Sequence, residues 1–319
     1  MLKKTVPIAF AFDENLVFPA CVCLTSLLVN ALPETFYDIF ILYSGSAKFD
    51  TSDIDQLAVE YGNCKITYRE VDQSFDDAYE VRGITTPAYY RLLIPAMIPE
   101  YEKILYSDVD VIFREDLSHF YEIDMSGYYF AGVDVGVKYR PEIRNYVENI
   151  LRLDSSKGYF YSGNLVINSQ KILQDGLIEK FKDHAQKRYR FQDMDIINIA
   201  CNGFIKELSP EFCLTNYLYD LLLTSGERLE YTNDALSTIL TKGIIHYNGA
   251  KPWKEICFNQ DFWWHYYRNS IIYDEKFCFR YYEDVLTKVD RWPLRKRLKH
   301  IIRYFMPKMG TGNGNTSVQ

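Results

Sequence analysis

The N-terminal part of the chain alternates short apolar runs with amphipathic stretches. The apolar runs with the length of β-strands are residues 6–12, 37–43 and 65–71. Between them, residues 17–30 and 51–61 carry apolar side chains at helical spacing. This order of strands and helices is typical of a parallel sheet covered by helices. We therefore expect a Rossmann-like α/β fold with a mostly parallel central sheet.

The segment from Tyr101 to Phe113 places two acidic residues inside an apolar run. Its pattern predicts a strand buried on both faces, interrupted by Asp108 and Asp110. On an extended chain, residues two apart point the same way, so the two carboxylates would lie together. Burying two like charges is costly, and a divalent cation with oxygen ligands would offset that cost. Two other interpretations stay open: the carboxylates cap the next turn, or Asp108 is the nucleophile of a haloacid-dehalogenase-like phosphatase.

The rest of the chain continues the α/β pattern. A short helix over 87–94 would carry Arg91, and the residues from 138 to 157 read as a polar lid or acceptor loop. Ligands of open α/β sheets bind at the carboxyl ends of strands, so Asp13 and Asp108 are expected to face one crevice. Further strands are predicted over 127–134, 159–168, 204–208 and 243–246, and further helices over 172–189 and from 191 onward.

A polar turn follows the last predicted strand. His246 ends that strand and could ligate a metal through a ring nitrogen. Gly249 would let the backbone approach a ligand closely, and Lys251 offers a compact charge suited to phosphate. A buried structural histidine and a surface lysine would produce the same pattern, so this turn alone leaves both interpretations open.

Composition narrows the class of protein. The net charge is −7, and 27 Tyr and 20 Phe supply faces that suit sugar and base stacking. An acidic chain of this kind is not a general nucleic-acid binder. Seven cysteines without a Cys-x-x-Cys pair argue against a disulfide framework or a zinc cage, so we expect reduced thiols in a cytoplasm. The N-terminus reads as a strand rather than a signal peptide, and no run has the length of a membrane span.

Positive charge gathers near the C-terminus. Residues 285–319 contain eight Lys or Arg and one acidic residue, Asp290. A helix here would carry basic residues opposite an apolar face, which is typical of a helix lying on an anionic membrane. A helix packed on the domain with a solvated basic face is the alternative. The apolar face comprises Leu294, Leu298, Ile301, Ile302 and Phe305.

Six sequence blocks follow one another along the chain: Ala11–Asn15, Tyr90–Leu92, Leu105–Val111, Tyr161–Asn168, Phe191–Asp195 and His246–Trp253. In this order they resemble the blocks of glycosyltransferase family 8. This family comprises retaining nucleotide-sugar enzymes, among them glycogenins and bacterial lipooligosaccharide galactosyl- and glucosyltransferases. The resemblance covers about residues 6–255. It disfavours the phosphatase, whose nucleophile box normally lies on the first strand.

The resemblance implies a fold, a metal and a set of ligand contacts. The fold would be the GT-A nucleotide-diphospho-sugar transferase fold over 1–255, followed by an aromatic and basic helical extension over 256–308 and a disordered tail over 309–319. Mn²⁺ or Mg²⁺ would be held by Asp108, Asp110 and His246. The residues implied to bind the UDP-sugar are Ala11, Asp13, Asn15, Arg91, Asp108, Val109, Ser162, Asp193, His246, Gly249 and Lys251.

The resemblance also implies catalytic and acceptor roles. Arg91, Asp108 and Asp193 would act in catalysis, and Asp134 and the Phe191 region would face the acceptor. Met194 stands where the family often has Gln. A thioether offers no useful nucleophile, so attack on the face from which the leaving phosphate departs is favoured. Asp193 or Asp195 as the nucleophile is the alternative. Tyr161 replaces a common Asn, and the His246 motif has one residue fewer before Lys251 than its commonest form.

The implied activity is a metal-dependent retaining hexosyl transfer. Glucose or galactose would pass from UDP-glucose or UDP-galactose to a hydroxyl of a glycan or glycolipid acceptor, in bacterial cell-surface polysaccharide, lipopolysaccharide or glycoprotein glycan synthesis. The enzyme would be cytoplasmic, or peripheral on the inner face of the cell membrane through residues 291–306. A non-catalytic UDP-sugar-binding or glycan-binding homologue stays open, as does a self-glycosylating, glycogenin-like variant.

Overall fold

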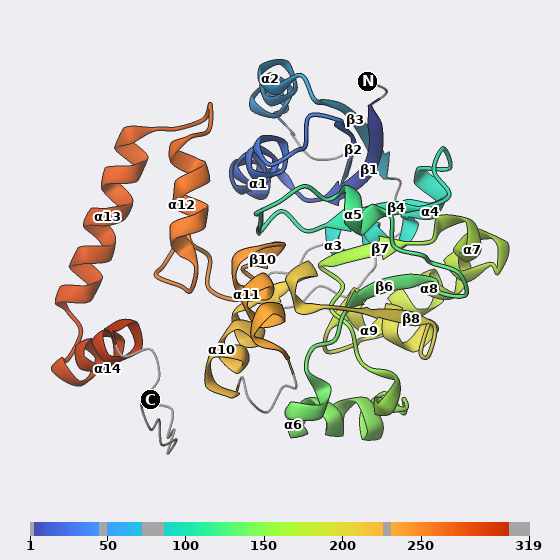
Figure 1. The fold of residues 1–319 in the computed structure, drawn as a ribbon. Coiled ribbons are helices and arrows are strands. Elements are labelled where there is room, and N and C mark those ends of the chain that lie inside the picture. The colour runs from blue at the N-terminus through green and yellow to red at the C-terminus, as the bar shows by residue number, and fades with distance from the viewer. Residues whose placement is uncertain (1–2, 45–49, 72–85, 226–230, 306–319) are drawn as a thin grey trace, which may run out of the picture.

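The computed structural model describes residues 3–44, 50–71, 86–225 and 231–305. They form two β-sheets with helices on both faces of the larger sheet, and a group of C-terminal helices lies to one side (Figure 1). The tail from 309 to 319, predicted to be disordered, lies outside the described residues. So do residues 306–308 of the C-terminal extension.

The larger sheet has seven strands and is mostly parallel, as the sequence predicts. Its spatial order is β3-β2-β1-β4-β7-β6-β8. Strands β3, β2, β1 and β4 run parallel to one another, whereas β7 is antiparallel to both of its neighbours. The strands are β1 (Lys4–Ala11), β2 (Thr35–Ser44), β3 (Cys64–Val71), β4 (Ile104–Ser107), β6 (Phe130–Val133), β7 (Asn164–Ile167) and β8 (Ile205–Leu208).

Alternation along the strands divides the core into two layers. In β1, Ile8 and Phe10 point to one face of the sheet, and Ala9 and Ala11 point to the other. The first face packs against α1 (Val17–Val29) and α2 (Ser52–Tyr61). The second packs against further helices, which leaves the carboxyl ends of the strands as the open edge. These helices are α3 (Pro87–Tyr90), α4 (Ile94–Met97), α7 (Ser169–Gln174), α8 (Leu177–Ala185) and α9 (Gln192–Ala200).

A second sheet overturns the prediction of one strand through both aspartates. Strand β4 ends at Ser107, the chain turns at Asp108–Asp110, and β5 (Val111–Phe113) joins a separate sheet. There β5 pairs antiparallel with β10 (Ile244–His246), which is parallel to β9 (Leu214–Thr215). The amide of Tyr247 donates to the Asp110 carbonyl at 2.9 Å. The acidic motif therefore links two sheets and does not lie on an extended chain.

Several predicted boundaries also change. The strand expected over 159–168 is shorter, because continuous pairing covers only β7 and Phe160 forms an isolated bridge with Asp134. The helix expected over 172–189 is divided into α7 and α8 by Gly176, whose φ of 65° is left-handed. The segment from 138 to 157 contains the short helix α6 (Pro141–Asn145) and single turns. Helices α5 (Ser118–Tyr121), α10 (Asn216–Ser225) and α11 (Asn233–Thr241) also lie within residues 1–255.

Aromatic side chains join the C-terminal helices to the sheets. Helices α12 (Gln260–Arg268) and α13 (Glu275–Asp290) share a buried cluster with α1, β5 and β10. The Phe18 ring lies 5.8 Å from Trp263, 5.3 Å from Tyr267 and 4.9 Å from Phe277, centroid to centroid. Helix α14 (Leu294–Phe305) occupies the predicted basic segment. Within the described ranges, every helix is too short or too polar to cross a membrane.

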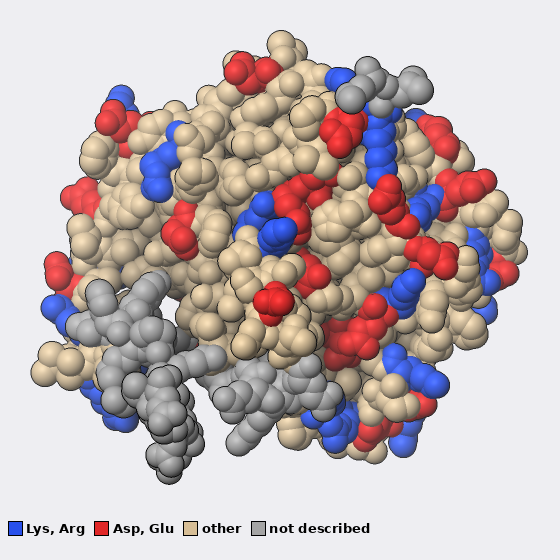
Figure 2. Space-filling model, viewed as in Figure 1, with Lys and Arg blue, Asp and Glu red and all other residues tan. Residues whose placement is uncertain are grey.

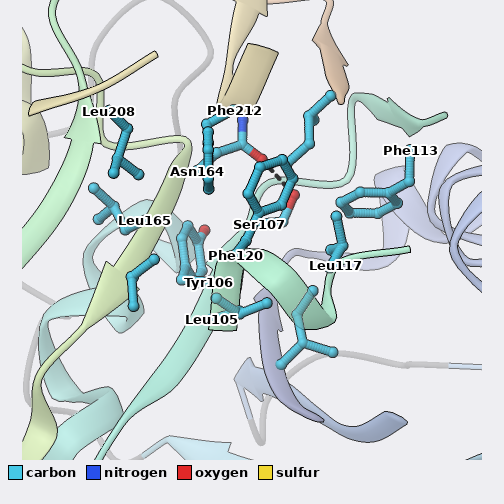
Figure 3. Close-up of a pocket in the computed structure, with 13 residues that line it drawn as sticks. Leu105, Tyr106, Ser107, Phe113, Leu117, Phe120, Asn164, Leu165, Leu208 and Phe212 are labelled. Carbon is cyan, nitrogen blue, oxygen red and sulfur yellow. Dashed lines mark hydrogen bonds between the residues drawn. The ribbon is translucent and has the colours of Figure 1, made fainter. Parts of the chain in front are cut away.

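A cavity of about 20 Å³, close to the volume of one water molecule, lies between the two sheets. Figure 3 shows the rings of Phe113, Phe120 and Phe212 around it. A polar pair also lines it: the Ser107 hydroxyl donates to Asn164 Oδ1 at 2.8 Å. The cavity is an apolar core void, and its polar side is the back of the site described below.

The aromatic cluster predicts how the C-terminal helices contribute to stability. Phe18→Ala should lower the free energy of unfolding by about 2–3 kcal/mol, because the ring packs against three aromatic neighbours from α12 and α13. Phe279→Ala on α13 is the matched control, since that ring is 68% exposed. Urea unfolding measures both variants. Equal effects would show that the helices do not depend on this contact.

Candidate active site

Asp108, Asp110 and His246 converge where the two sheets meet. The chain turn after β4 carries the aspartates, and His246 ends β10. One ligand atom from each residue lies within 4.8 Å of the other two. His246 Nε2 is 3.2 Å from Asp110 Oδ1 and 3.7 Å from Asp108 Oδ2. The prediction that these three residues lie together is confirmed, although the backbone that brings them together is a turn.

Lys251 also points into this cluster. Its ammonium group contacts Asp110 Oδ2 and donates to the Tyr247 carbonyl at 2.6 Å. Burial raises the pKa of the Asp110 carboxyl, but the positive charges of His246 and Lys251 outweigh burial and hold that pKa below its usual range. The shorter spacing between Gly249 and Lys251 thus still lets the lysine reach the aspartate pair.

The protein fixes which nitrogen of His246 faces the carboxylates. On the other side of the ring, Nδ1 lies 3.4 Å from Cys213 Sγ and 3.4 Å from Asn164 Nδ2. Asn164 is in turn held by Ser107. Burial lowers the pKa of His246, but the charge of Asp110 outweighs it and raises this pKa to about 10. Nε2 is therefore the nitrogen available to a cation, because Nδ1 is enclosed by Cys213 and Asn164.

Gly163 leaves the space that this cluster needs. A Cβ atom at this position would lie 2.2 Å from His246 Cε1 and 2.7 Å from Asp108 Oδ2. The Gly163 carbonyl also accepts the amide of Asp108 at 2.8 Å, which ties the turn to the start of β7. Any larger residue would displace the histidine or the carboxylate, so glycine is required by close approach rather than by its φ angle.

Arg91 connects the aspartate pair to helix α9. This guanidinium is 5% exposed; its Nη2 lies 2.9 Å from Asp108 Oδ1 and its Nε lies 3.2 Å from Asp193 Oδ2. Nη1 donates to the Ser162 carbonyl at 2.6 Å, and the Tyr106 ring lies 4.6 Å below the guanidinium carbon. Burial lowers the pKa of Arg91, but the two carboxylates outweigh it and raise that pKa further. Arg91 is thus a fixed positive charge that positions both acids.

The acids at the start of α9 have different environments. Burial raises the pKa of Asp193, and Arg91 opposes this shift. Asp195 is fully buried and accepts from the hydroxyls of Tyr146 and Tyr159 and from the Phe191 amide at 2.7 Å. Its carboxylate therefore organises the start of the helix. Asp193 remains the acid of this pair that lies beside Arg91 and Asp108.

The residues predicted to hold the nucleoside lie at the neighbouring strand end. In the β1–β4 register Ala9 pairs with Tyr106, so Ala11 and the turn at Asp108 come to the same edge of the sheet. Asp13 accepts the backbone amide of Asn15 at 3.0 Å and so begins a 3₁₀ turn. Ala11 is buried and Asn15 is exposed. Their contact with a nucleoside stays a prediction.

The other predicted site residues differ in which of their atoms are available to a ligand. The Val109 side chain is buried in the core, so its backbone is what could reach a ligand. Gly249 is exposed on the turn that carries Lys251. Tyr161 points toward Thr215, whose hydroxyl lies 3.3 Å from its own. Asp134 accepts three backbone amides, from residues 136, 137 and 159, so its carboxylate holds a loop.

Sequence reasoning assigned no role to three residues that build this site. Gly163 and Asn164 lie in a block that carries the family resemblance, so a search for close backbone approach could have found the glycine. Cys213 had no signal in the sequence, because isolated cysteines are usually core residues. Its contact with His246 depends on β9 lying beside β10.

The donor set fits a hard or borderline divalent cation. Two carboxylates and one imidazole provide three ligands, which leaves positions for phosphate oxygens and water. Gly163 keeps the space beside these donors free of a Cβ atom. The residues present could therefore hold Mn²⁺ or Mg²⁺, and the donor set alone does not choose between them.

Comparison with known proteins agrees with this geometry. The family model for glycosyl transferase family 8 matches residues 7–257. The chain belongs to glycosyltransferase family 8. Family membership removes the phosphatase interpretation of Asp108. General stress protein A of Bacillus subtilis is 26% identical over 238 residues, which cover 72% of this chain and 80% of that protein. The lipopolysaccharide 1,2-glucosyltransferase of Escherichia coli is 24% identical over 79% of this chain and 73% of that protein.

Solved structures of glycosyltransferases share the fold. The galactosyltransferase LgtC, solved with donor and acceptor sugar analogues, superposes with a TM-score of 0.69 at 22% identity, over 85% of this chain and 98% of that one. The bifunctional glycosyltransferase WbbM superposes with a TM-score of 0.69 at 19% identity, over 90% of this chain and 52% of that one. The GT-A fold predicted from the sequence is thus confirmed for this family 8 chain.

Gly163 provides a test of the metal site that does not need a substrate. Gly163→Ala should weaken Mn²⁺ binding at least about tenfold, because the added methyl group would displace His246 or Asp108. Gly249→Ala is the control, since a Cβ there would lie 3.8 Å from Asn216 Nδ2, at ordinary van der Waals distance. Electron paramagnetic resonance of free Mn²⁺ measures both affinities. Unchanged binding in Gly163→Ala would refute this location of the metal.

Proposed function

We propose that this family 8 glycosyltransferase is a metal-dependent, retaining hexosyltransferase that uses a UDP-sugar. The observation that carries the proposal is the convergence of Asp108, Asp110 and His246 beside Lys251 and Arg91. The donor would be UDP-glucose or UDP-galactose and the acceptor a hydroxyl of a glycan or glycolipid. The pathway would be bacterial cell-surface polysaccharide, lipopolysaccharide or glycoprotein glycan synthesis.

Residues around the cluster have distinct proposed roles toward the donor. Asp108, Asp110 and His246 would hold Mn²⁺ or Mg²⁺, which supplies charge stabilisation for the departing diphosphate. Lys251 would exchange its contact with Asp110 for the diphosphate, with Gly249 close to the same group. Arg91 would keep Asp108 and Asp193 oriented around the donor sugar, next to Ser162. Ala11, Asp13, Asn15 and Val109 would line the nucleoside end.

The environment of α9 supports attack on the same face as departure. Met194 offers a thioether, which is no nucleophile for an anomeric carbon. Asp195 is occupied by two tyrosine hydroxyls and one amide. Asp193 Oδ2 lies 3.2 Å from Arg91 Nε, and attack by this oxygen on an anomeric carbon would break that ion pair. We therefore favour a step in which the acceptor hydroxyl attacks as the leaving phosphate departs and gives its proton to that phosphate.

The location of the protein is part of the proposal. We infer a cytoplasmic enzyme that binds the inner face of the cell membrane through residues 291–306. On α14, Leu294 is 71% exposed, Leu298 is 47% exposed and Ile302 is 53% exposed. These side chains have helical spacing and lie among basic residues, as expected for a helix resting on anionic lipid.

Donor cleavage tests the proposed activity directly. Wild type with Mn²⁺ should release UDP from one sugar in a panel of UDP-sugars, and EDTA should abolish the release. Asp110→Asn should lower the rate at least about 100-fold, because the amide keeps the volume but removes the charge that binds the cation. A coupled UDP assay measures both. Asp53→Asn is the matched control, because it makes the same change at an exposed position of α2.

The outcomes separate the open alternatives. UDP that binds without turnover, with any sugar and added acceptor, would favour a non-catalytic binding homologue. A mass increase of one hexose on a tyrosine-containing peptide of the enzyme would indicate self-glycosylation. Failure to bind UDP at all would contradict the assignment of the cluster.

Vesicle sedimentation tests the proposed membrane contact. The protein should sediment with vesicles rich in phosphatidylglycerol and remain in solution with phosphatidylcholine vesicles, because the helix is basic. Leu294→Glu with Leu298→Glu should reduce sedimentation about tenfold, since two exposed apolar contacts are lost and two negative charges are added. Val59→Glu is the control: this 84% exposed residue lies on α2. Equal loss in both variants would contradict the assigned surface.

A further inference from the structure

A cleft outside the active site lies beside the C-terminal helices. It has a volume of about 510 Å³ and lies between the loop at residues 255–256 and helices α13 and α14. Lys288, Arg291 and Lys296 line it, together with Trp292. Helix α13 lies at the left in Figure 1, and both basic and acidic side chains are visible along that edge of the molecule in Figure 2.

The positive charges of this cleft outnumber the negative charges among the residues that line it. No ion pair found among the described residues involves Lys288, Arg291 or Lys296. Asp290 is the one acid between residues 285 and 319, and its ion-pair partner is Arg297, 3.9 Å away. Glu255 is the one acid that lines the cleft. Three cations and one carboxylate therefore face the same space, in a chain whose total charge is −7.

The cleft is built for a small, multiply charged anion. The Arg291 guanidinium provides a planar set of donors, and the two lysines provide point charges on flexible stems, a combination that suits phosphate oxygens. Lys296 already lies over the Trp292 ring, 4.3 Å from its centroid, so its ammonium group is held near the cleft rather than extended into solvent. Arg297 donates to the Trp292 carbonyl at 3.0 Å and fixes the start of α14.

One turn of chain connects the cleft to the proposed active site. The Lys251 carbonyl accepts the amides of Lys254 and Glu255, each at 2.9 Å. The residue whose ammonium group contacts Asp110 therefore belongs to the same turn as one wall of the cleft. A ligand held between this wall and α13 would lie against the turn that carries Lys251.

We propose that this cleft binds a phosphate or diphosphate group of the acceptor substrate. The assignment of the bound group to an acceptor substrate rests on the proposed transferase function. The binding of phosphate by the cleft does not. The phosphate belongs to a lipid carrier or to a water-soluble phosphorylated glycan. The exposed leucines of α14 begin beside Lys296, so a carrier in a membrane under α14 would bring its phosphate to the cleft.

Titration calorimetry with simple probes tests the site. The probes are inorganic phosphate, pyrophosphate, dihexanoyl phosphatidic acid as monomers, and dihexanoyl phosphatidylcholine, which has no net charge. Lys288→Ala with Arg291→Ala removes two cleft cations. The matched control, Arg295→Ala with Lys299→Ala, removes the same charge from exposed positions of α14 that do not line the cleft. All titrations use about 150 mM salt, where exposed charges more than about 8 Å apart are screened.

The site predicts a difference between two variants of equal charge. At least one phosphate probe should bind wild type, the cleft variant should bind it at least about tenfold more weakly, and the control should stay within about twofold. Preference for the lipid phosphate indicates a lipid carrier, and equal binding of pyrophosphate indicates a soluble phosphorylated acceptor. Equal loss in both variants, or no binding of any phosphate probe to wild type, would overturn the proposal.

The transferase function can fail separately. Release of UDP from the donor by water needs no acceptor, so the cleft variant should retain it. Phosphate binding with no UDP release would reject the transferase and keep the anion site. UDP release without phosphate binding would keep the transferase and reject the anion site.

Discussion

The structure around the site depends on the compensation of two partly buried negative charges. Asp108 and Asp110 lie where two sheets meet and are largely removed from water, so losing their positive partners would be costly. Arg91 compensates Asp108, while His246 and Lys251 compensate Asp110. These three cationic groups come from a short helix, a strand end and a turn. The need to bring them to one point explains why a four-residue strand ends in a turn instead of continuing.

Each compensating group is itself held in one orientation. Arg91 donates to two backbone carbonyls besides its ion pairs, and its guanidinium lies over Tyr106. His246 Nδ1 contacts Cys213 and Asn164, and the absence of a Cβ atom at Gly163 makes room for the imidazole ring. Such support keeps ligand atoms within a few tenths of an ångström of a working arrangement. The aromatic cluster behind β10 extends the same support to the C-terminal helices.

The sequence predicted the strands of the sheet well because their patterns are local. Alternating apolar residues in β1 and helical spacing in α1 need no information from elsewhere in the chain. The turn at Asp108–Asp110 was missed because it is required by pairing of β5 with β10, which lies far away in sequence. Cys213 was missed for the same reason, since β9 places it behind His246. The three metal-ligating candidates were found because the family resemblance, and not periodicity, linked His246 to the aspartates.

The motif that links two sheets also has a consequence for the order of folding. Lys251 and Asp110 are separated by 141 residues, and β5 has its pairing partner only once β10 has formed. Closing such a long loop is entropically costly and slow, so this contact should be among the last to form. A chain still emerging from the ribosome would already have its first three parallel strands while its two aspartates remained apart from the histidine. The capacity to bind a cation would then arise only in a molecule whose fold is nearly complete.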